Sequence, residues 1–175
     1  MNEYNYIFKY LQKIINNKSV LIYGEILENE LKFLKNNKIS IVDENLDGLI
    51  KLKKIYPDID FNQSLYFIKE KFDFLILLSD SPISHKDYLK DTGIFINIQF
   101  INNQEEYHKL ILTENKQNFE FIERVNLYKK DTVIGLINSK NAVFEENDLF
   151  NQIPDVIIEF YSDFKLDIKN TVNLI

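Results

Sequence analysis

Short apolar runs alternate with amphipathic stretches along most of this 175-residue chain, and this alternation restricts it to α/β folds. The runs have the length of buried strands, whereas the stretches between them repeat apolar residues every three or four positions, as helices do. Such strand–helix–strand units form parallel sheets covered by helices on both faces. We therefore predict a doubly wound, mostly parallel, Rossmann-like sheet. The predicted strands are 19–23, 39–42, 59–61, 72–78 and 94–100, and the predicted helices are 4–15, 27–34, 46–55, 65–69, a short one ending near Lys90, and 104–113.

The alternation stops after the last of these helices. Segments 119–128 and 132–138 both look like strands, and only three residues separate them. So short a link permits an antiparallel hairpin and forbids a parallel crossover. We therefore predict an antiparallel C-terminal hairpin at the edge of the sheet.

Residues 153–168 repeat apolar side chains at helical spacing, and Pro154 suits a first helical turn. We predict a helix that either packs on the core or presents an apolar stripe to a partner, for example in a homodimer. The expected organisation is one domain over residues 1–175. It comprises an N-terminal helix (1–18), a Rossmann-like core (19–140) and a helical appendage (141–175).

Composition excludes several functions. The 27 acidic residues outnumber the 21 basic ones, and the net charge of -6 disfavours nucleic acid as a partner. The absence of cysteine excludes disulfides and thiolate metal sites. The first residues lack the pattern of a signal peptide, and the longest apolar run is too short to span a bilayer, so we expect a cytoplasmic protein without a membrane partner.

Four segments, 20–24, 41–43, 72–82 and 89–93, carry a resemblance to class I S-adenosylmethionine-dependent methyltransferases. Within that group, residues 19–140 look most like the catalytic domain of spermidine synthases (polyamine aminopropyltransferases). The resemblance implies S-adenosylmethionine or decarboxylated S-adenosylmethionine as cofactor and no metal. The cofactor-binding positions that it implies are Gly24 and Glu25 after the first strand, Asp43 at the ribose, Gln63 at the adenine, and Ser79 in the active-site loop.

Each of these residues also has a simpler interpretation. Glu25 could begin a helix, because the helix dipole favours an acid there. Asp43 could cap the helix that follows it, and Gln63 could be a surface residue. All of these alternatives remain open at the level of sequence.

The chain departs from the family's pattern at the positions that matter most for chemistry. Residues 25–28 carry bulky side chains where the family has a glycine-rich loop that admits the cofactor. Leu78 stands where the resemblance places the catalytic aspartate, and leucine cannot take a proton. Asp80, two residues on, is the remaining candidate for a catalytic base, or else a turn residue before Ser81-Pro82.

These departures lead to a first hypothesis: a degenerate relative of these enzymes with lost or altered catalysis that binds a nucleoside-type ligand. An active aminopropyl- or methyltransferase with an atypical site and a non-enzymatic interaction protein are the alternatives. His85 and His108 are the only histidines, and their spacing does not suggest a metal site. His85, just beyond the active-site loop, is a further candidate for touching a ligand.

Overall fold

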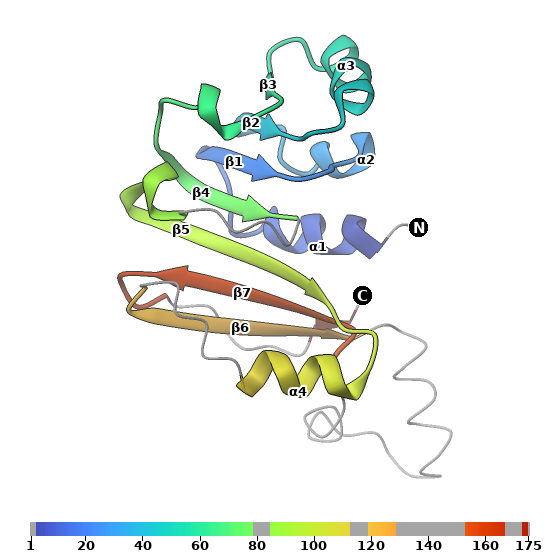
Figure 1. Ribbon diagram of the computed structural model, residues 1–175, viewed down its shortest axis with the longest axis vertical. Helices are drawn as coiled ribbons and strands as arrows, with labels where there is room; N and C mark the ends of the chain where they lie inside the picture. The colour runs from blue at the N-terminus through green and yellow to red at the C-terminus, as the bar shows by residue number, and fades with distance from the viewer. Residues whose placement is uncertain (1–2, 79–84, 113–118, 129–152, 167–172, 175) are drawn as a thin grey trace.

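The computed structural model describes residues 3–78, 85–112, 119–128, 153–166 and 173–174 (Figure 1). Its sheet has the order β3-β2-β1-β4-β5-β7-β6-β8 in this part of the chain. The strands are β1 (Ser19–Tyr23), β2 (Lys38–Val42), β3 (Asp60–Asn62), β4 (Phe72–Leu77), β5 (Leu89–Phe100), β6 (Phe121–Tyr128), β7 (Val156–Ser162) and β8 (Asn173–Leu174). The helices are α1 (Glu3–Leu11), α2 (Glu28–Leu31), α3 (Leu46–Ile55) and α4 (Gln104–Leu112), with 3-10 turns η1 (Leu65–Phe67) and η2 (His85–Tyr88).

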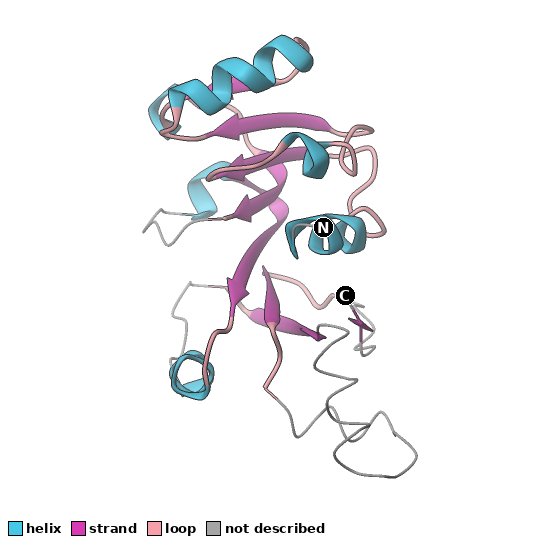
Figure 2. Ribbon diagram, turned by 90° about the vertical axis from the view of Figure 1, so that its right-hand side faces the viewer, coloured by secondary structure: helices cyan, strands magenta, loops and turns pink. Residues whose placement is uncertain are grey.

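The first five strands run parallel, and β7 is antiparallel to both of its neighbours, β5 and β6. The prediction of a doubly wound, mostly parallel sheet with an antiparallel C-terminal pair is therefore confirmed. The central strands β1 and β4 are almost entirely buried, because helices and turns cover both of their faces. Figure 2 shows the sheet nearly edge-on, with α1 beside the N label on one side and α4, seen end-on near the bottom, on the other.

Each face of the sheet has its own apolar core. On one face, strand residues pack against Ile7, Phe8 and Leu11 of α1 and against residues of α2 and α3. On the other face, the core includes Phe72, Phe95 and Tyr161 and is covered by shorter segments. His85 belongs to this second face, where its ring stacks on Phe95 with centroids 3.9 Å apart.

The prediction of a helix over 153–168 is wrong. Val156–Ser162 forms strand β7, which lies inside the sheet between β5 and β6, and all seven of its residues are buried. A strand that is apolar on both faces has no alternation, so its sequence can fit a helical period by chance. Its β-branched and aromatic residues favour a strand. The part of the apolar stripe that lies in Val156–Ser162 is therefore in the core, as is the apolar face of α1.

The antiparallel partner of β6 is thus β7, whereas the predicted partner, 132–138, falls outside the described residues. Strand β5 begins earlier than the predicted strand 94–100, at Leu89, and is irregular there: Leu89 pairs with Phe72, and Ile94 with Phe74. A Cβ at Gly93 would lie 2.9 Å from the carbonyl oxygen of Lys90, which explains a glycine at this irregularity. The helix predicted over 27–34 is shorter, spanning Glu28–Leu31.

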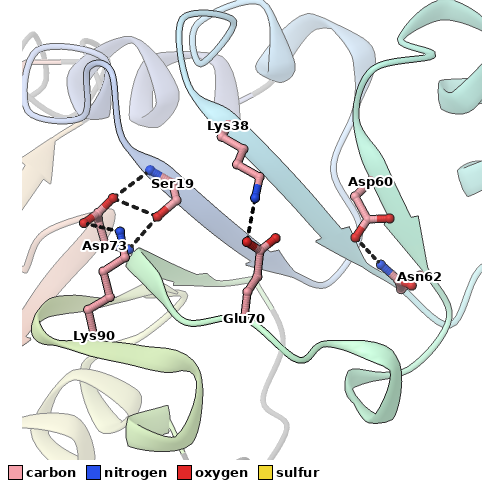
Figure 3. Close-up of polar contacts among 7 residues, drawn as sticks. All are labelled: Ser19, Lys38, Asp60, Asn62, Glu70, Asp73 and Lys90. Atoms are coloured by element: carbon pink, nitrogen blue, oxygen red, sulfur yellow. Dashed lines mark hydrogen bonds and ion pairs between the residues drawn. The ribbon is translucent and has the colours of Figure 1, made fainter.

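Polar contacts join the amino ends of the parallel strands (Figure 3). One carboxylate oxygen of Asp73 accepts hydrogen bonds from the backbone N–H of Ser19 at 2.8 Å and from its hydroxyl at 2.7 Å. The Lys90 ammonium donates to the other oxygen at 2.9 Å. Burial raises the pKa of Asp73, but the hydrogen bonds from Ser19 and Lys90 and the charge of Lys90 outweigh it and lower the pKa to about 2. This network ties β1, β4 and β5 together.

No helix in the described ranges is long and apolar enough to cross a membrane.

Candidate functional site

The loops that leave β1, β2 and β4 begin side by side. The Gly24 N–H donates to the Val42 carbonyl at 2.9 Å, and the Leu78 N–H donates to the Tyr23 carbonyl at 2.9 Å. Gly24 and Asp43 are therefore brought together, as expected for residues at the carboxyl ends of adjacent parallel strands. This end of a doubly wound sheet is where such folds bind ligands.

The packing of the chain itself requires the glycine at position 24. Its φ angle is +117°, a conformation that side chains rarely adopt. A Cβ built there would lie 3.0 Å from the Cβ of Leu78 and 3.1 Å from its carbonyl carbon. Gly24 is thus explained without a cofactor, so its presence alone does not argue for one.

The loop that follows Gly24 is held by the chain's own side chains. Ile26 is buried in the core, and the Leu27 N–H donates to the carboxylate of Glu30 at 2.7 Å. The pKa of Glu30 is raised, chiefly because its carboxyl group is buried. The hydrogen bond from Leu27 lowers this pKa in part, and the nearby charge of Glu25 raises it further. Glu25 is exposed and lies before α2, whose first turn contains Glu28 and Glu30. This loop is therefore filled by the chain's own side chains.

Asp43 turns the chain from β2 toward α3. Its Oδ1 accepts a hydrogen bond from the Asn45 N–H at 3.0 Å, and Asn45 in turn caps α3 by accepting from the Gly48 N–H at 3.1 Å. The helix cap is therefore Asn45, not Asp43 or Glu44. The described residues leave Oδ2 of Asp43 without a hydrogen bond, so this oxygen can accept one from a ligand hydroxyl.

A cavity of about 610 Å³ opens beside Asp43, between the loop after β1 and helix α3. This volume lies within the range of small-molecule sites. Four carboxylates and two lysines line it together with apolar side chains, so its walls are acidic overall. The lining residues are Glu25, Ile26, Leu27, Glu28, Asp43, Asn45, Asp47, Gly48, Lys51, Leu52, Lys54 and Ile55.

The other predicted site residues are not part of this cavity. Gln63 follows β3, is exposed and does not line the cavity. Ser79 and Asp80 lie outside the described residues, so their prediction stands as it was. Leu78 packs against Gly24. His108 is exposed on α4, and His85 is buried against Phe95.

The sequence analysis did not identify the residues of α3 that line the cavity. It also did not identify Glu30, whose carboxylate accepts a hydrogen bond from the loop after β1. Asp47 and Lys51 lie one helical turn apart, and this spacing after Asp43 signals that both can face the same cavity. Glu30 follows Leu27 by three residues, the spacing of a capping box, but Leu27 is not a usual cap residue. Within the described ranges, no three His, Asp or Glu residues gather into a possible metal site.

No protein-family model matches the sequence, and neither does any curated protein. Solved structures do match. The structure is similar to a TehB-like SAM-dependent methyltransferase from Corynebacterium glutamicum, with a TM-score of 0.56, 11% identity, and coverage of 92% of this chain and 88% of that chain.

Two further neighbours are methyltransferases of similar length. A precorrin-6y C5,15-methyltransferase from Geobacter metallireducens has a TM-score of 0.54 and 13% identity, covering 90% of this chain and 87% of its own. The plantazolicin methyltransferase BpumL, solved in complex with a monoazolic desmethylPZN analog and SAH, has a TM-score of 0.52 and 10% identity, covering 92% and 82%. At such identities the likeness is one of fold. The chain therefore has the Rossmann-like α/β fold of class I S-adenosylmethionine-dependent methyltransferases.

Proposed function

We propose that this protein is a divergent relative of methyltransferases and spermidine synthases that has lost or altered catalysis and binds a nucleoside-type ligand beside Asp43. The observation that carries the proposal is the cavity of about 610 Å³ at the carboxyl ends of β1 and β2, which is lined by Asp43, whose Oδ2 makes no hydrogen bond with the described residues. A carboxylate at this place can accept hydrogen bonds from ribose hydroxyls. The neighbouring methyltransferase BpumL was solved with SAH, which supports a ligand of this class.

Two features argue that any chemistry is lost or altered. Leu78 packs on Gly24, and an apolar side chain there can neither orient nor deprotonate an attacking amine. Ile26 and the Leu27–Glu30 hydrogen bond fill the loop after β1, where the glycines of the family would let a cofactor approach. A ligand must therefore bind nearer to α3 than in a glycine-rich site.

The charge of the cavity selects among the possible ligands. Glu25, Glu28, Asp43 and Asp47 outnumber Lys51 and Lys54, so a ligand carboxylate is repelled and a cationic sulfonium is attracted. Apolar side chains of Ile26, Leu27, Leu52 and Ile55 supply surfaces on which a base can pack. We expect decarboxylated S-adenosylmethionine to bind more tightly than S-adenosylmethionine, whose carboxylate cancels one of its positive charges, and uncharged methylthioadenosine to bind most weakly.

Isothermal titration with these three compounds tests the proposal on the wild type and on three variants. Asp43→Ala removes both carboxylate oxygens, whereas Asp43→Asn keeps an oxygen that can accept the Asn45 N–H and preserve the turn. We expect both variants to lose at least tenfold in affinity, about 1.4 kcal/mol, because a ribose hydroxyl loses its charged acceptor.

Asp58→Ala is the matched control, because Asp58 is an exposed carboxylate after α3 that does not line the cavity. It should bind like the wild type. If the folded wild type shows no heat with any of the three compounds, it has no nucleoside site, and the proposal is wrong. If Asp43→Asn binds normally, Asp43 serves only the turn.

A further inference from the structure

A second polar cluster lies on the opposite face of the sheet from α1, away from the cavity. It centres on Glu159 of β7, whose side chain is completely buried (0% exposed). Arg124 donates to it through Nε at 2.7 Å, the Tyr161 hydroxyl donates at 2.6 Å, and the Asn97 amide lies at 3.4 Å. These residues come from β5, β6 and β7, three strands that are adjacent in the sheet (Figure 1).

Among the described residues, the partner of Arg124 contacts one end of its guanidinium only. In the described part of the chain, Nε is the sole nitrogen of Arg124 that makes a hydrogen bond or ion pair, and the side chain is 36% exposed. Its two terminal amino groups, with four N–H donors, thus have no such contact with the described residues and can donate to another partner. An arginine anchored in this way presents a planar pair of donors that matches the two oxygens of a carboxylate or phosphate.

The choice of residue argues that this geometry is used. Arg124 is the only arginine among the 21 basic residues of the chain. A lysine could neutralise the charge of Glu159, but once its ammonium is paired it has no planar pair of N–H donors left for a ligand. Glu159 accepts from three donors, so its burial is compensated and it can hold the guanidinium in one orientation.

The register of the sheet places the cluster level with the strand ends that carry the candidate site. Tyr23 pairs with Leu77, and Leu77 pairs with Asn97. Asn97 then pairs with Glu159, which pairs with Arg124. Side chains that are paired in this way share one face of the sheet. The row runs from the carboxyl ends of β1 and β4 to Arg124.

We infer that Arg124, positioned by Glu159, binds the carboxylate or phosphate group of a small molecule on this face of the sheet. The pair carries no net charge, so the binding energy comes from directional N–H donors in a half-buried place rather than from a basic surface. The inference stands apart from the proposed nucleoside site, which involves other residues on the other face.

The single arginine makes the test direct, because its Nε–Hε pair gives one unambiguous resonance in a ¹H–¹⁵N NMR spectrum. We expect inorganic phosphate or succinate to displace this resonance in a saturable manner, whereas sodium chloride at matched ionic strength does not. A response to phosphate alone or to succinate alone tells which oxyanion the site prefers. No displacement by either probe, or an equal one with chloride, overturns the inference.

Variants distinguish an anion-binding site from an ion pair that only stabilises the fold. Arg124→Lys keeps the positive charge beside Glu159 but loses the planar pair of terminal amino groups. We expect this variant to abolish the ³¹P line broadening of phosphate and the saturation transfer to succinate. Lys86→Gln is the matched control, because Lys86 is a half-exposed base on the same side that pairs with Asp163. It should leave both signals unchanged. Equal binding by Arg124→Lys and the wild type would overturn the inference.

The positioning role of Glu159 has its own measurement. In Glu159→Gln we expect the Nε–Hε bond of Arg124 to become mobile in ¹⁵N relaxation and the affinity for the probe to fall. A rigid Nε–Hε bond in this variant would show that Glu159 does not hold the guanidinium. Titrating Asp43→Ala with the same anions keeps the two proposals distinguishable, because the response of Arg124 should survive there.

Discussion

The network around Asp73 makes the acid stability of this protein predictable. Folding lowers the pKa of Asp73 from 3.8 to about 2, and its side chain is only 26% exposed. At roughly 1.4 kcal/mol per pKa unit, this shift corresponds to about 2.5 kcal/mol of stability in the ionised state. Because the folded pKa lies below the unfolded one, this contribution is present at neutral pH. It is lost as the pH falls from about 4 to about 2.

Asp73→Asn removes the charge but retains an oxygen that can accept from Ser19. We expect urea unfolding, followed by circular dichroism, to show a loss of about 2 kcal/mol at pH 7. The difference from the wild type should shrink below about pH 4 and vanish near pH 2. Lys90→Gln should lose part of this amount, and added salt should reduce that part, because the Lys90 ammonium is half-exposed.

Asp58→Asn serves as the control, since Asp58 is exposed. It should change the stability little at any pH. The reasoning is refuted if the loss in Asp73→Asn stays the same from neutral pH down to about pH 2.5, because a constant loss reflects packing or hydrogen bonding rather than ionisation.

Three further predictions concern the two faces of the sheet. Gly24→Ala should destabilise the fold by about 1–3 kcal/mol in urea unfolding, because of its positive φ and its contact with Leu78; adding Leu78→Ala should recover only the part due to the contact. Glu30 has a raised pKa, so its ionisation costs stability as the pH rises through that value. Glu30→Gln should therefore gain stability relative to the wild type between pH 4 and pH 7 in thermal melts. Arg124→Ala leaves the buried carboxylate of Glu159 without its cation and should cost about 3 kcal/mol in urea unfolding, whereas Arg124→Lys should cost less.

Those parts of the fold that alternate between one apolar strand and one helix could be predicted from the sequence. Strands β1 and β4 are short, continuous apolar runs that end at glycine or polar residues, and such runs have few other interpretations. Strand β7 could not be recognised, because a strand buried on both faces has no period of its own. With residues 153–168 predicted as a helix, the pairing of Glu159 with Arg124 across neighbouring strands could not be predicted.

For the candidate site, the sequence predicted which residues follow the strand ends, but not which residues line the cavity. Gly24 and Asp43 follow neighbouring strands, and neighbouring parallel strands end at one edge, so their proximity was predictable. The cavity depends on how α3 packs beside the loop after β1, which no local pattern reveals. The same holds for Ile26, whose burial closes that loop. Gln63 was expected near a ligand by resemblance, but it is exposed after β3 and does not line the cavity.

The position of β7 has a consequence for how the molecule forms during synthesis. The chain completes β5 at Phe100 and β6 at Tyr128, yet the strand that joins them begins only at Val156. On the ribosome, both of these strands must wait with unpaired edges until β7 emerges, and open edges are where chains pair with the wrong neighbour. Pairing strands that lie this far apart in the sequence is also slow. Chaperone dependence and aggregation of nascent chains should therefore be greatest just before residues 156–162 leave the exit tunnel.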